Sequence, residues 1–94
     1  MKIQIRAVAD IAKILNCRLT YIDIPEHSTL ADLLRELTDS FGLEFYEAVC
    51  TEEGYSADRV AVLVNGSSAA AIGGTGVRLK DGDDVLILPI ISGG

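Results

Sequence analysis

The chain has 94 residues, of which 49% are hydrophobic and 23% are charged, and its formal net charge is -6 at pH 7. This length supports one small domain with a single core, and the composition is typical of a globular protein rather than a disordered or fibrous one. The negative charge disfavours nucleic acid and anionic membranes as partners. No apolar stretch approaches the roughly 20 residues of a membrane-spanning helix, and we expect a cytoplasmic protein.

The N-terminal part of the sequence predicts two strands. Residues 2–8 alternate between apolar and polar positions, and residues 18–24 alternate again before Pro25, which cannot donate a ladder hydrogen bond. The segment between them, residues 9–16, is too long for a tight hairpin turn. Its apolar residues predict one helical turn over the sheet edge.

The middle of the sequence predicts one long helix. Its apolar stripe at helical spacing consists of Leu30, Leu33, Leu34, Leu37 and Phe41. Thr29 and Asp32 resemble a capping box at the start of this helix. Gly42 is placed to close its far end in the left-handed conformation.

The C-terminal part predicts the remaining strands. Residues 60–64 are a β-branched run followed by the turn signal Asn65-Gly66. We expect a short strand at 68–72, a flexible glycine-rich loop at 73–76 and a tight turn at Asp81-Gly82. Residues 85–88 read as a strand that is apolar on both faces, which predicts a central position in the sheet, and Pro89 marks its end. This order predicts an α+β fold in which one main helix covers a mixed sheet of four or five strands.

No group of residues in the sequence predicts a catalytic or metal site. Residues 81–84 lack the spacing and the flanking helices of an EF-hand, and residues 73–76 fit neither phosphate-loop pattern. His27 is the only histidine, and Cys17 and Cys50 have no C-x-x-C spacing. We therefore expect no metal, no bound cofactor and no catalysis by the chain itself.

The end of the sequence is its most distinctive chemical feature. An apolar run leads into Gly93 and Gly94, and we expect residues 89–94 to form a slim, flexible tail. A carboxylate is a poor electrophile until one oxygen becomes a leaving group, for instance by adenylation with ATP, and the acyl-adenylate then accepts sulfide or an amine. A Cβ on the last residue would crowd the approach of these groups, and glycine removes that obstacle.

Three segments carry a resemblance to a known family. They are Val64-Asn65-Gly66, residues 79–85 (LKDGDDV) and residues 89–94 (PIISGG). They resemble the molybdopterin synthase small subunit, the MoaD-type sulfur carrier of the MoaD/ThiS family, which has a ubiquitin-like β-grasp fold. The resemblance covers nearly the whole chain and is weakest over residues 43–59. The family usually carries Phe-Pro-Pro before the tail, whereas Leu88-Pro89-Ile90 keeps only the first proline.

The resemblance implies a single β-grasp domain, residues 1–94, that acts as a sulfur carrier in molybdenum cofactor biosynthesis. Gly94 would be adenylated by an E1-like (MoeB-like) adenylyltransferase and converted to a thiocarboxylate with sulfur from a donor enzyme. The tail would enter the large (MoaE-like) synthase subunit, which would hold the catalytic residues, and deliver sulfur to precursor Z. No cofactor would stay bound.

The residues expected to act in this way lie at the end of the chain. Gly94 and Gly93 would carry the sulfur, and apolar side chains beyond the strand end cannot all reach the core, so they are available to a partner. The expected docking residues are Leu88, Pro89, Ile90, Ile91 and Ser92.

Other functions remain open for the same residues. A thiamin-type carrier of this fold is usually shorter between Phe41 and Val60, so length favours the molybdopterin type, while carriers for cysteine or tungsten-cofactor synthesis would look alike. A ubiquitin-like protein modifier would use the same activated carboxylate but end as an isopeptide on a lysine. A binding module with an idle tail is the alternative from a different class.

Overall fold

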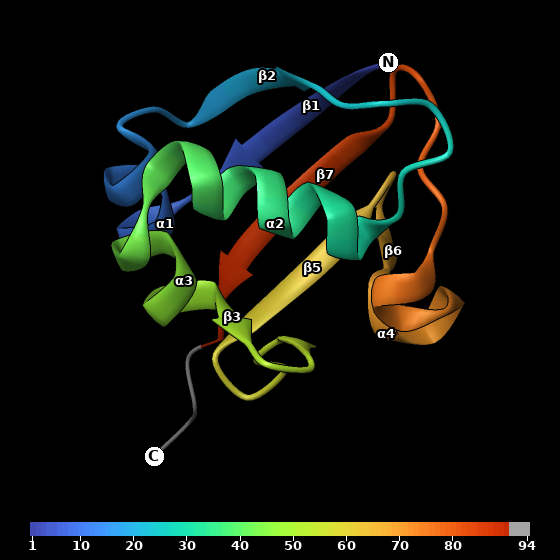
Figure 1. The fold of residues 1–94 in the computed structure, drawn as a ribbon. Coiled ribbons are helices and arrows are strands. Elements are labelled where there is room, and N and C mark those ends of the chain that lie inside the picture. The colour runs from blue at the N-terminus through green and yellow to red at the C-terminus, as the bar shows by residue number, and fades with distance from the viewer. Residues whose placement is uncertain (91–94) are drawn as a thin grey trace.

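The computed structural model describes residues 1–90, and residues 91–94 lie outside the described part. Figure 1 shows a mixed sheet with helices packed against it, which confirms the predicted α+β class. In chain order the elements are β1 (Lys2–Ala7), α1 (Ala9–Leu15), β2 (Leu19–Asp23), α2 (Leu30–Phe41), α3 (Leu43–Val49), β3 (Cys50–Thr51), β4 (Gly54–Tyr55), β5 (Val60–Val64), β6 (Ser67–Ser68), α4 (Ala69–Ile72), a 3-10 turn η1 (Gly74–Gly76) and β7 (Asp84–Pro89).

The main sheet has five strands in the order β2-β1-β7-β5-β6. β7 lies at its centre, parallel to β1 and antiparallel to β5, so the prediction of a central last strand is confirmed. The other pairings in this sheet are antiparallel, and β3 and β4 form a separate two-stranded hairpin.

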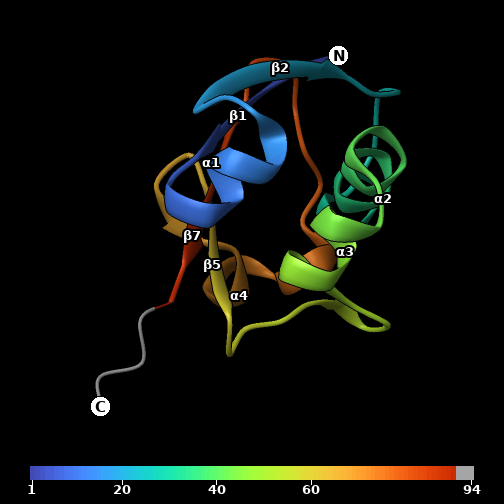
Figure 2. The same cartoon turned by 90° about the vertical axis from the view of Figure 1, so that its left-hand side faces the viewer.

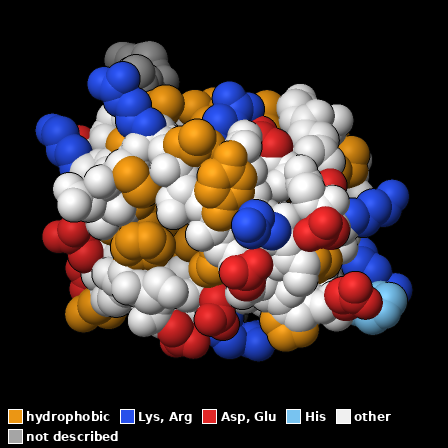
Figure 3. Space-filling view, turned by 90° about the horizontal axis from the view of Figure 1, so that it is seen from above, with side chains coloured by type: hydrophobic (Ala, Val, Ile, Leu, Met, Phe, Trp, Pro, Cys, Tyr) orange, Lys and Arg blue, Asp and Glu red, His pale blue; other side chains and the backbone are white. Residues whose placement is uncertain are grey.

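The helices cover one face of the main sheet. Figure 2 shows α2 and α3 on the same side of β7 and β5, and α1 packs against both α3 and β7. The opposite face carries polar and partly exposed side chains, including Gln4, Arg6 and Tyr21. Seen from the β2 side, hydrophobic side chains lie among Lys, Arg, Asp and Glu side chains (Figure 3). We call the face of the main sheet that the helices leave uncovered the open face.

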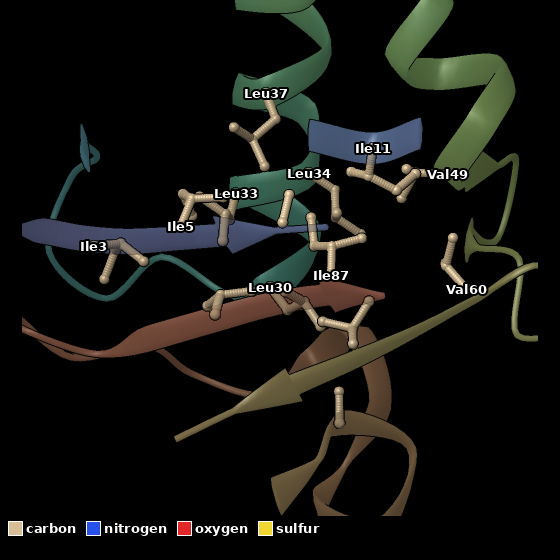
Figure 4. Close-up of a cluster of buried hydrophobic side chains, with 14 of the residues drawn as sticks. Ile3, Ile5, Ile11, Leu30, Leu33, Leu34, Leu37, Val49, Val60 and Ile87 are labelled. Atoms are coloured by element: carbon tan, nitrogen blue, oxygen red, sulfur yellow. The ribbon is translucent and has the colours of Figure 1, made fainter. Parts of the chain in front are cut away.

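The core lies between α2 and the central strands. Side chains from β1, β7 and α2 converge there, as Figure 4 shows for Ile3, Ile5, Ile87, Leu30, Leu33 and Leu37. Each of these side chains is completely buried. The apolar stripe predicted for the long helix is therefore its core face, and burial of such side chains stabilises the fold by about 1.5–3 kcal/mol each.

Both ends of α2 are marked by the predicted residues. Thr29 Oγ1 accepts a hydrogen bond from Asp32 N at 3.3 Å, and Asp32 Oδ2 accepts one from Thr29 N at 2.9 Å, which confirms the capping box. The hydrogen bond from the Thr29 backbone is the main reason why the pKa of Asp32 is lowered. Gly42 has a positive φ of 84° but a ψ of -166°, so the predicted left-handed helical conformation is wrong. Its extended ψ redirects the chain into α3, where Phe45 N donates to Gly42 O.

Four segments differ from the prediction. Within residues 9–16, Ala9–Leu15 form a helix of seven residues rather than one turn, and α3 was not expected at all. The strand predicted at 68–72 is wrong, because only Ser67 and Ser68 pair with β5 and the alanine-rich segment that follows forms α4. Alanine has the highest helix propensity, and Ala69 is fully buried in this conformation. Residues 74–76 form the 3-10 turn where a loop was expected.

The Asn65-Gly66 turn lies in one of the segments that carry the family resemblance and is hydrogen-bonded to a second, residues 79–85. Both residues have positive φ, 52° and 86°, as a two-residue hairpin turn between Val64 and Ser67 requires. The Asn65 side chain accepts a hydrogen bond from Asp84 N at 2.9 Å and donates one to Asp83 Oδ1 at 2.9 Å. The acidic segment 81–84 is thus a turn that anchors the start of β7, as its turn chemistry predicted.

Gly54 offers a test of how the β3–β4 hairpin is attached. A Cβ at Gly54 would lie 2.5 Å from Thr75 Cγ2, and Gly54 has a φ of +135°. We expect Gly54→Ala to lower the free energy of unfolding by about 1–3 kcal/mol in urea titrations, because both strain and overlap oppose it. Gly76→Ala is the matched control, since its Cβ would meet no atom within 4 Å. Addition of Thr75→Ser to Gly54→Ala should restore part of the loss, and no restoration would contradict the steric explanation.

Candidate functional site at the end of the last strand

The last strand leads directly to the segment that the sequence singled out. Leu88 pairs with Ala61, and Pro89 pairs with Val60, so β7 continues through Pro89 rather than ending before it. Ile90 N then donates a hydrogen bond to Arg59 O at 2.8 Å. Hydrogen bonds to β5 and to Arg59, the residue before β5, therefore hold the main chain as far as Ile90. Of the predicted site residues, Leu88, Pro89 and Ile90 lie in the described part, and Ile91, Ser92, Gly93 and Gly94 lie outside it.

The side chains of β7 alternate between the core and the open face. Val85 and Ile87 are completely buried beneath the helices. Leu86 and Leu88 are half-buried on the open face, where they lie in register with the half-buried Leu63 and Ala61 of β5. Ile90, with 43% of its surface exposed, extends this row. We call these five residues, Ala61, Leu63, Leu86, Leu88 and Ile90, the apolar row.

The other half of the open face is polar. Arg6 binds Asp84 through two hydrogen bonds, Nε to Oδ1 at 2.8 Å and Nη2 to Oδ2 at 2.7 Å. Gln4 Nε2 donates to Asp84 Oδ1 at 2.8 Å, and Tyr21 OH donates to Gln4 Oε1 at 3.2 Å. This network crosses β2, β1 and β7. It leaves the apolar row as the hydrophobic part of the open face next to the end of β7.

The Arg6–Asp84 pair should make stability depend on pH. The hydrogen bonds from Arg6 are the main reason why the pKa of Asp84 is lowered. A lowered pKa in the folded state stabilises the fold fully above the unfolded-state pKa of about 3.9, and this stabilisation is lost as the pH falls through the folded-state pKa.

We therefore expect Asp84→Asn to lower the free energy of unfolding by about 1 kcal/mol at neutral pH, because the pair is partly exposed, and by less in acid. Urea titrations at neutral pH and at a pH below 3 measure this difference. Asp39→Asn, an exposed carboxylate on α2, is the control. An Asp84→Asn effect that is the same at both pH values would contradict the role of the ionised pair.

Arg59 is a residue of this region that the sequence did not indicate. Its guanidinium donates hydrogen bonds to Glu47 O and to Cys50 O, the latter at 3.2 Å, while its own carbonyl accepts from Ile90 N. Arg59 thus ties the end of α3 to the point where the chain leaves β7. The sequence could not indicate this role, because no known sequence motif marks an arginine before a β-branched run as such a link.

The two thiols of the chain are not part of the apolar row. Cys50 is buried beside a cavity of about 310 Å³ between α2, α3 and the β3–β4 hairpin, and burial raises the pKa of its thiol. Cys17 and Cys50 are both free thiols. Within residues 1–90, no three His, Cys, Asp or Glu side chains are grouped so that they could hold a metal ion. No helix in the same range is long and apolar enough to span a membrane.

A mixed five-stranded sheet, covered on one face by a main helix, with a central last strand that leads to the chain end, defines a ubiquitin-like β-grasp protein. The model of the ThiS family matches residues 8–94, and the chain belongs to this family. The family resemblance and the β-grasp fold predicted from the sequence are thus confirmed. The chain is therefore a member of a family of small sulfur carriers and ubiquitin-like modifiers, which are generally not catalytic.

The similar proteins include both modifier proteins and a molybdopterin converting factor subunit. The chain is 27% identical over 94 residues to small archaeal modifier protein 3 of Haloferax volcanii, covering 100% of both chains. The crystal structure of SAMP1 from Haloferax volcanii is similar with a TM-score of 0.79 and 25% identity over 100% of both chains. A putative molybdopterin converting factor subunit 1 from Pyrococcus furiosus is similar with a TM-score of 0.77 and 26% identity over 97% of this chain and 99% of that one.

Proposed function

We propose that this chain is a sulfur carrier in which the carboxylate of Gly94 is converted to a thiocarboxylate, and that it donates this sulfur as the small subunit of a molybdopterin synthase. The observation that carries the proposal is the course of β7. The strand is held at the centre of the sheet through Pro89, its main chain is bonded as far as Ile90, and Gly94 is only the fourth residue after Ile90 in the sequence.

The proposed chemistry needs no catalytic group from this chain. One carboxylate oxygen of Gly94 attacks the α-phosphate of ATP in an E1-like adenylyltransferase, and pyrophosphate leaves. Hydrosulfide from a sulfur donor enzyme then adds to the acyl carbon, and AMP leaves with the former carboxylate oxygen. The contribution of this chain is a terminus without Cβ atoms, which lets both reactants approach the carbonyl. ATP is consumed by the activating enzyme, and we propose that no cofactor stays on the carrier.

The proposed partner surface begins at the apolar row. A partner that covers the exposed Ile90 removes apolar area from water, which is the main source of affinity in such contacts. Insertion of the tail would then bring Gly94 to the partner's catalytic residues. We assign docking to Leu88, Pro89, Ile90, Ile91 and Ser92, and sulfur transfer to Gly93 and Gly94. The large synthase subunit, the E1-like enzyme and the sulfur donor enzyme are the proposed cytoplasmic partners.

The likeness to the putative converting factor subunit of Pyrococcus furiosus supports molybdopterin as the acceptor pathway. The intact mass of the protein tests the proposal after incubation with ATP, magnesium, the E1-like enzyme of the same organism and a sulfide source. We expect one oxygen to be replaced by sulfur. The sulfurated protein should then convert precursor Z to molybdopterin with the large subunit. An unchanged mass with a demonstrably active E1-like enzyme would contradict the carrier function.

A second candidate function is a ubiquitin-like protein modifier. The full-length similarity to small archaeal modifier protein 3 favours it. The same acyl-adenylate would then react with a lysine amine, directly or through the activating enzyme, to give an isopeptide. Mass spectrometry of tryptic digests from the native host would detect a remnant of the C-terminus on lysines of other proteins. Such remnants without any thiocarboxylate would favour the modifier over the carrier.

A further inference from the structure

The cavity of about 310 Å³ between α2, α3 and the β3–β4 hairpin has a largely apolar inner wall. This wall is formed by Leu34 and Cys50, which are buried, and by Ala31 and Tyr46, which are half-buried. Thr38 completes it, and its hydroxyl is already used, because it donates a hydrogen bond to Leu34 O at 2.9 Å and lies 3.7 Å from Cys50 Sγ. The volume is that of a pocket that holds a small ligand or a long side chain.

The rim of the cavity is acidic. Glu52 and Glu53 form the turn of the β3–β4 hairpin and line the opening with exposed side chains. Within residues 1–90, neither carboxylate is part of a salt bridge. Arg35 also lines the cavity, but its guanidinium is paired with Asp32 Oδ1 at 3.5 Å. The carboxylates of Glu52 and Glu53 are therefore the unpaired charges at the rim.

The charge of the whole chain is concentrated around this cavity. Residues 29–59, which contain α2, α3 and the hairpin, hold eight of the 14 acidic residues and only two of the eight basic ones, Arg35 and Arg59. This segment therefore accounts for the entire net charge of -6, and the rest of the chain is neutral. A surface of one sign attracts a partner surface of the opposite sign and speeds their encounter. The helix side of the molecule thus favours a basic partner.

An apolar wall behind an acidic rim matches one type of side chain. Lysine and arginine each carry an apolar stem and a cationic head, so the stem can pack against Leu34 while the head reaches Glu52 or Glu53. The ring of Tyr46 offers a second contact for the cation. An acidic side chain would be repelled at the rim, and a purely apolar one would cover the two carboxylates without replacing their contacts with water.

The cavity is connected to the end of β7 through Arg59. The guanidinium of Arg59 donates a hydrogen bond at 3.2 Å to the carbonyl of Cys50, which lines the cavity, and the carbonyl of Arg59 accepts one from Ile90 N at 2.8 Å. Figure 1 and Figure 2 both show the hairpin and the end of β7 at the same end of the molecule. A protein that receives the tail at this end is therefore placed to contact the cavity as well.

We propose that the cavity receives a lysine or arginine side chain of the E1-like enzyme that activates the tail. The inference rests on the proposed function, because it takes Gly94 to be the substrate of that enzyme. Both candidate functions of the chain require this enzyme, so the contact does not depend on whether sulfide or a lysine amine accepts the acyl group. The apolar row lies on the other face of the sheet. Contacts on both faces would hold the carrier in one orientation on the enzyme.

Calorimetric titration of the full chain with the E1-like enzyme of the same organism tests this contact. We expect the rim variant, Glu52→Gln combined with Glu53→Gln, to raise Kd by about tenfold, because the charge pairs at the rim are lost. Glu36→Gln combined with Glu44→Gln is the matched control, because it removes the same charge from exposed positions of residues 29–59 that do not line the cavity. The control should change Kd by about twofold or less, since solvent screens charges outside the contact. Raising the salt concentration from about 50 mM to about 500 mM should weaken the wild type more than the rim variant.

A second variant, Ala31→Phe, fills part of the cavity without changing any charge, and it should raise Kd by a similar factor of about ten. Circular dichroism melting shows whether this variant folds, and the rim variant keeps the test valid if it does not. Wild-type affinity in both variants would overturn the proposal. Equal losses in the rim variant and its matched control would also overturn it, because the attraction would then be a property of the whole acidic surface and not of the cavity.

Sulfuration of Gly94, measured by intact mass, separates this inference from the proposed function. If the enzyme sulfurates the wild type and binds both cavity variants as tightly as the wild type, the proposed function stands and the contact is refuted. If the wild type is neither bound nor sulfurated by a demonstrably active enzyme, the proposed function fails and the contact fails with it.

Discussion

Removal of Gly94 is expected to abolish thiocarboxylate formation while the fold keeps its stability. Deletion withdraws the carboxylate by one residue, about 3.3–3.6 Å in an extended chain, from the reactive groups of the activating enzyme. A displacement of 1 Å can cost about a hundredfold in rate, so the loss should exceed that factor. Gly94→Ala keeps the length but adds a Cβ beside the carbonyl, and we expect a large loss from it as well.

Intact mass spectrometry after timed incubation with ATP, the E1-like enzyme and a sulfide source measures this loss. Gly76→Ala is the matched control, because it makes the same substitution where a Cβ meets no atom within 4 Å. Thermal melting of all three variants should match the wild type. Sulfur transfer at the normal rate by the deletion variant would refute the role proposed for the tail, whichever acceptor it serves.

Replacement of Ile90 by aspartate is expected to weaken partner binding without unfolding the protein. Ile90 is 43% exposed at the end of the apolar row, and its structural bond to Arg59 O uses only the main chain. A buried interface would have to desolvate the new carboxylate, which lies next to an apolar surface. We expect a loss of about 1.4–3 kcal/mol in binding free energy, or at least about tenfold in Kd.

Calorimetric titration with the large synthase subunit, and separately with the E1-like enzyme, measures this effect. Ile72→Asp is the control, since Ile72 is an isoleucine of similar exposure on α4. An unchanged affinity of Ile90→Asp for both proteins would show that the apolar row does not dock. A loss of affinity for only one of them would assign the surface to that partner.

The comparison of prediction with structure shows where local information was sufficient. The periodicity of α2, its capping box and the Asn65-Gly66 turn each depend on residues within a few positions of one another, and all three were predicted from the sequence. α3 was missed because a helix of seven residues is not stable by its own propensity. It forms because Phe45 and Val49 are buried and because Arg59 donates a hydrogen bond to the carbonyl of Glu47 in its last turn.

The candidate site likewise has one part that could be predicted from the sequence and one part that could not. The diglycine, the apolar residues before it and the reactivity they imply could be predicted because they are covalent neighbours in the chain. The open face could not, because it arises from the strand order: Gln4 and Asp84 meet across 80 positions through the parallel pairing of β1 with β7. Helix periods, caps, turns and end-group chemistry are encoded by near neighbours. Which strands pair, which face stays uncovered and which edge lacks a partner are set by the burial of the whole core, which involves distant segments at once.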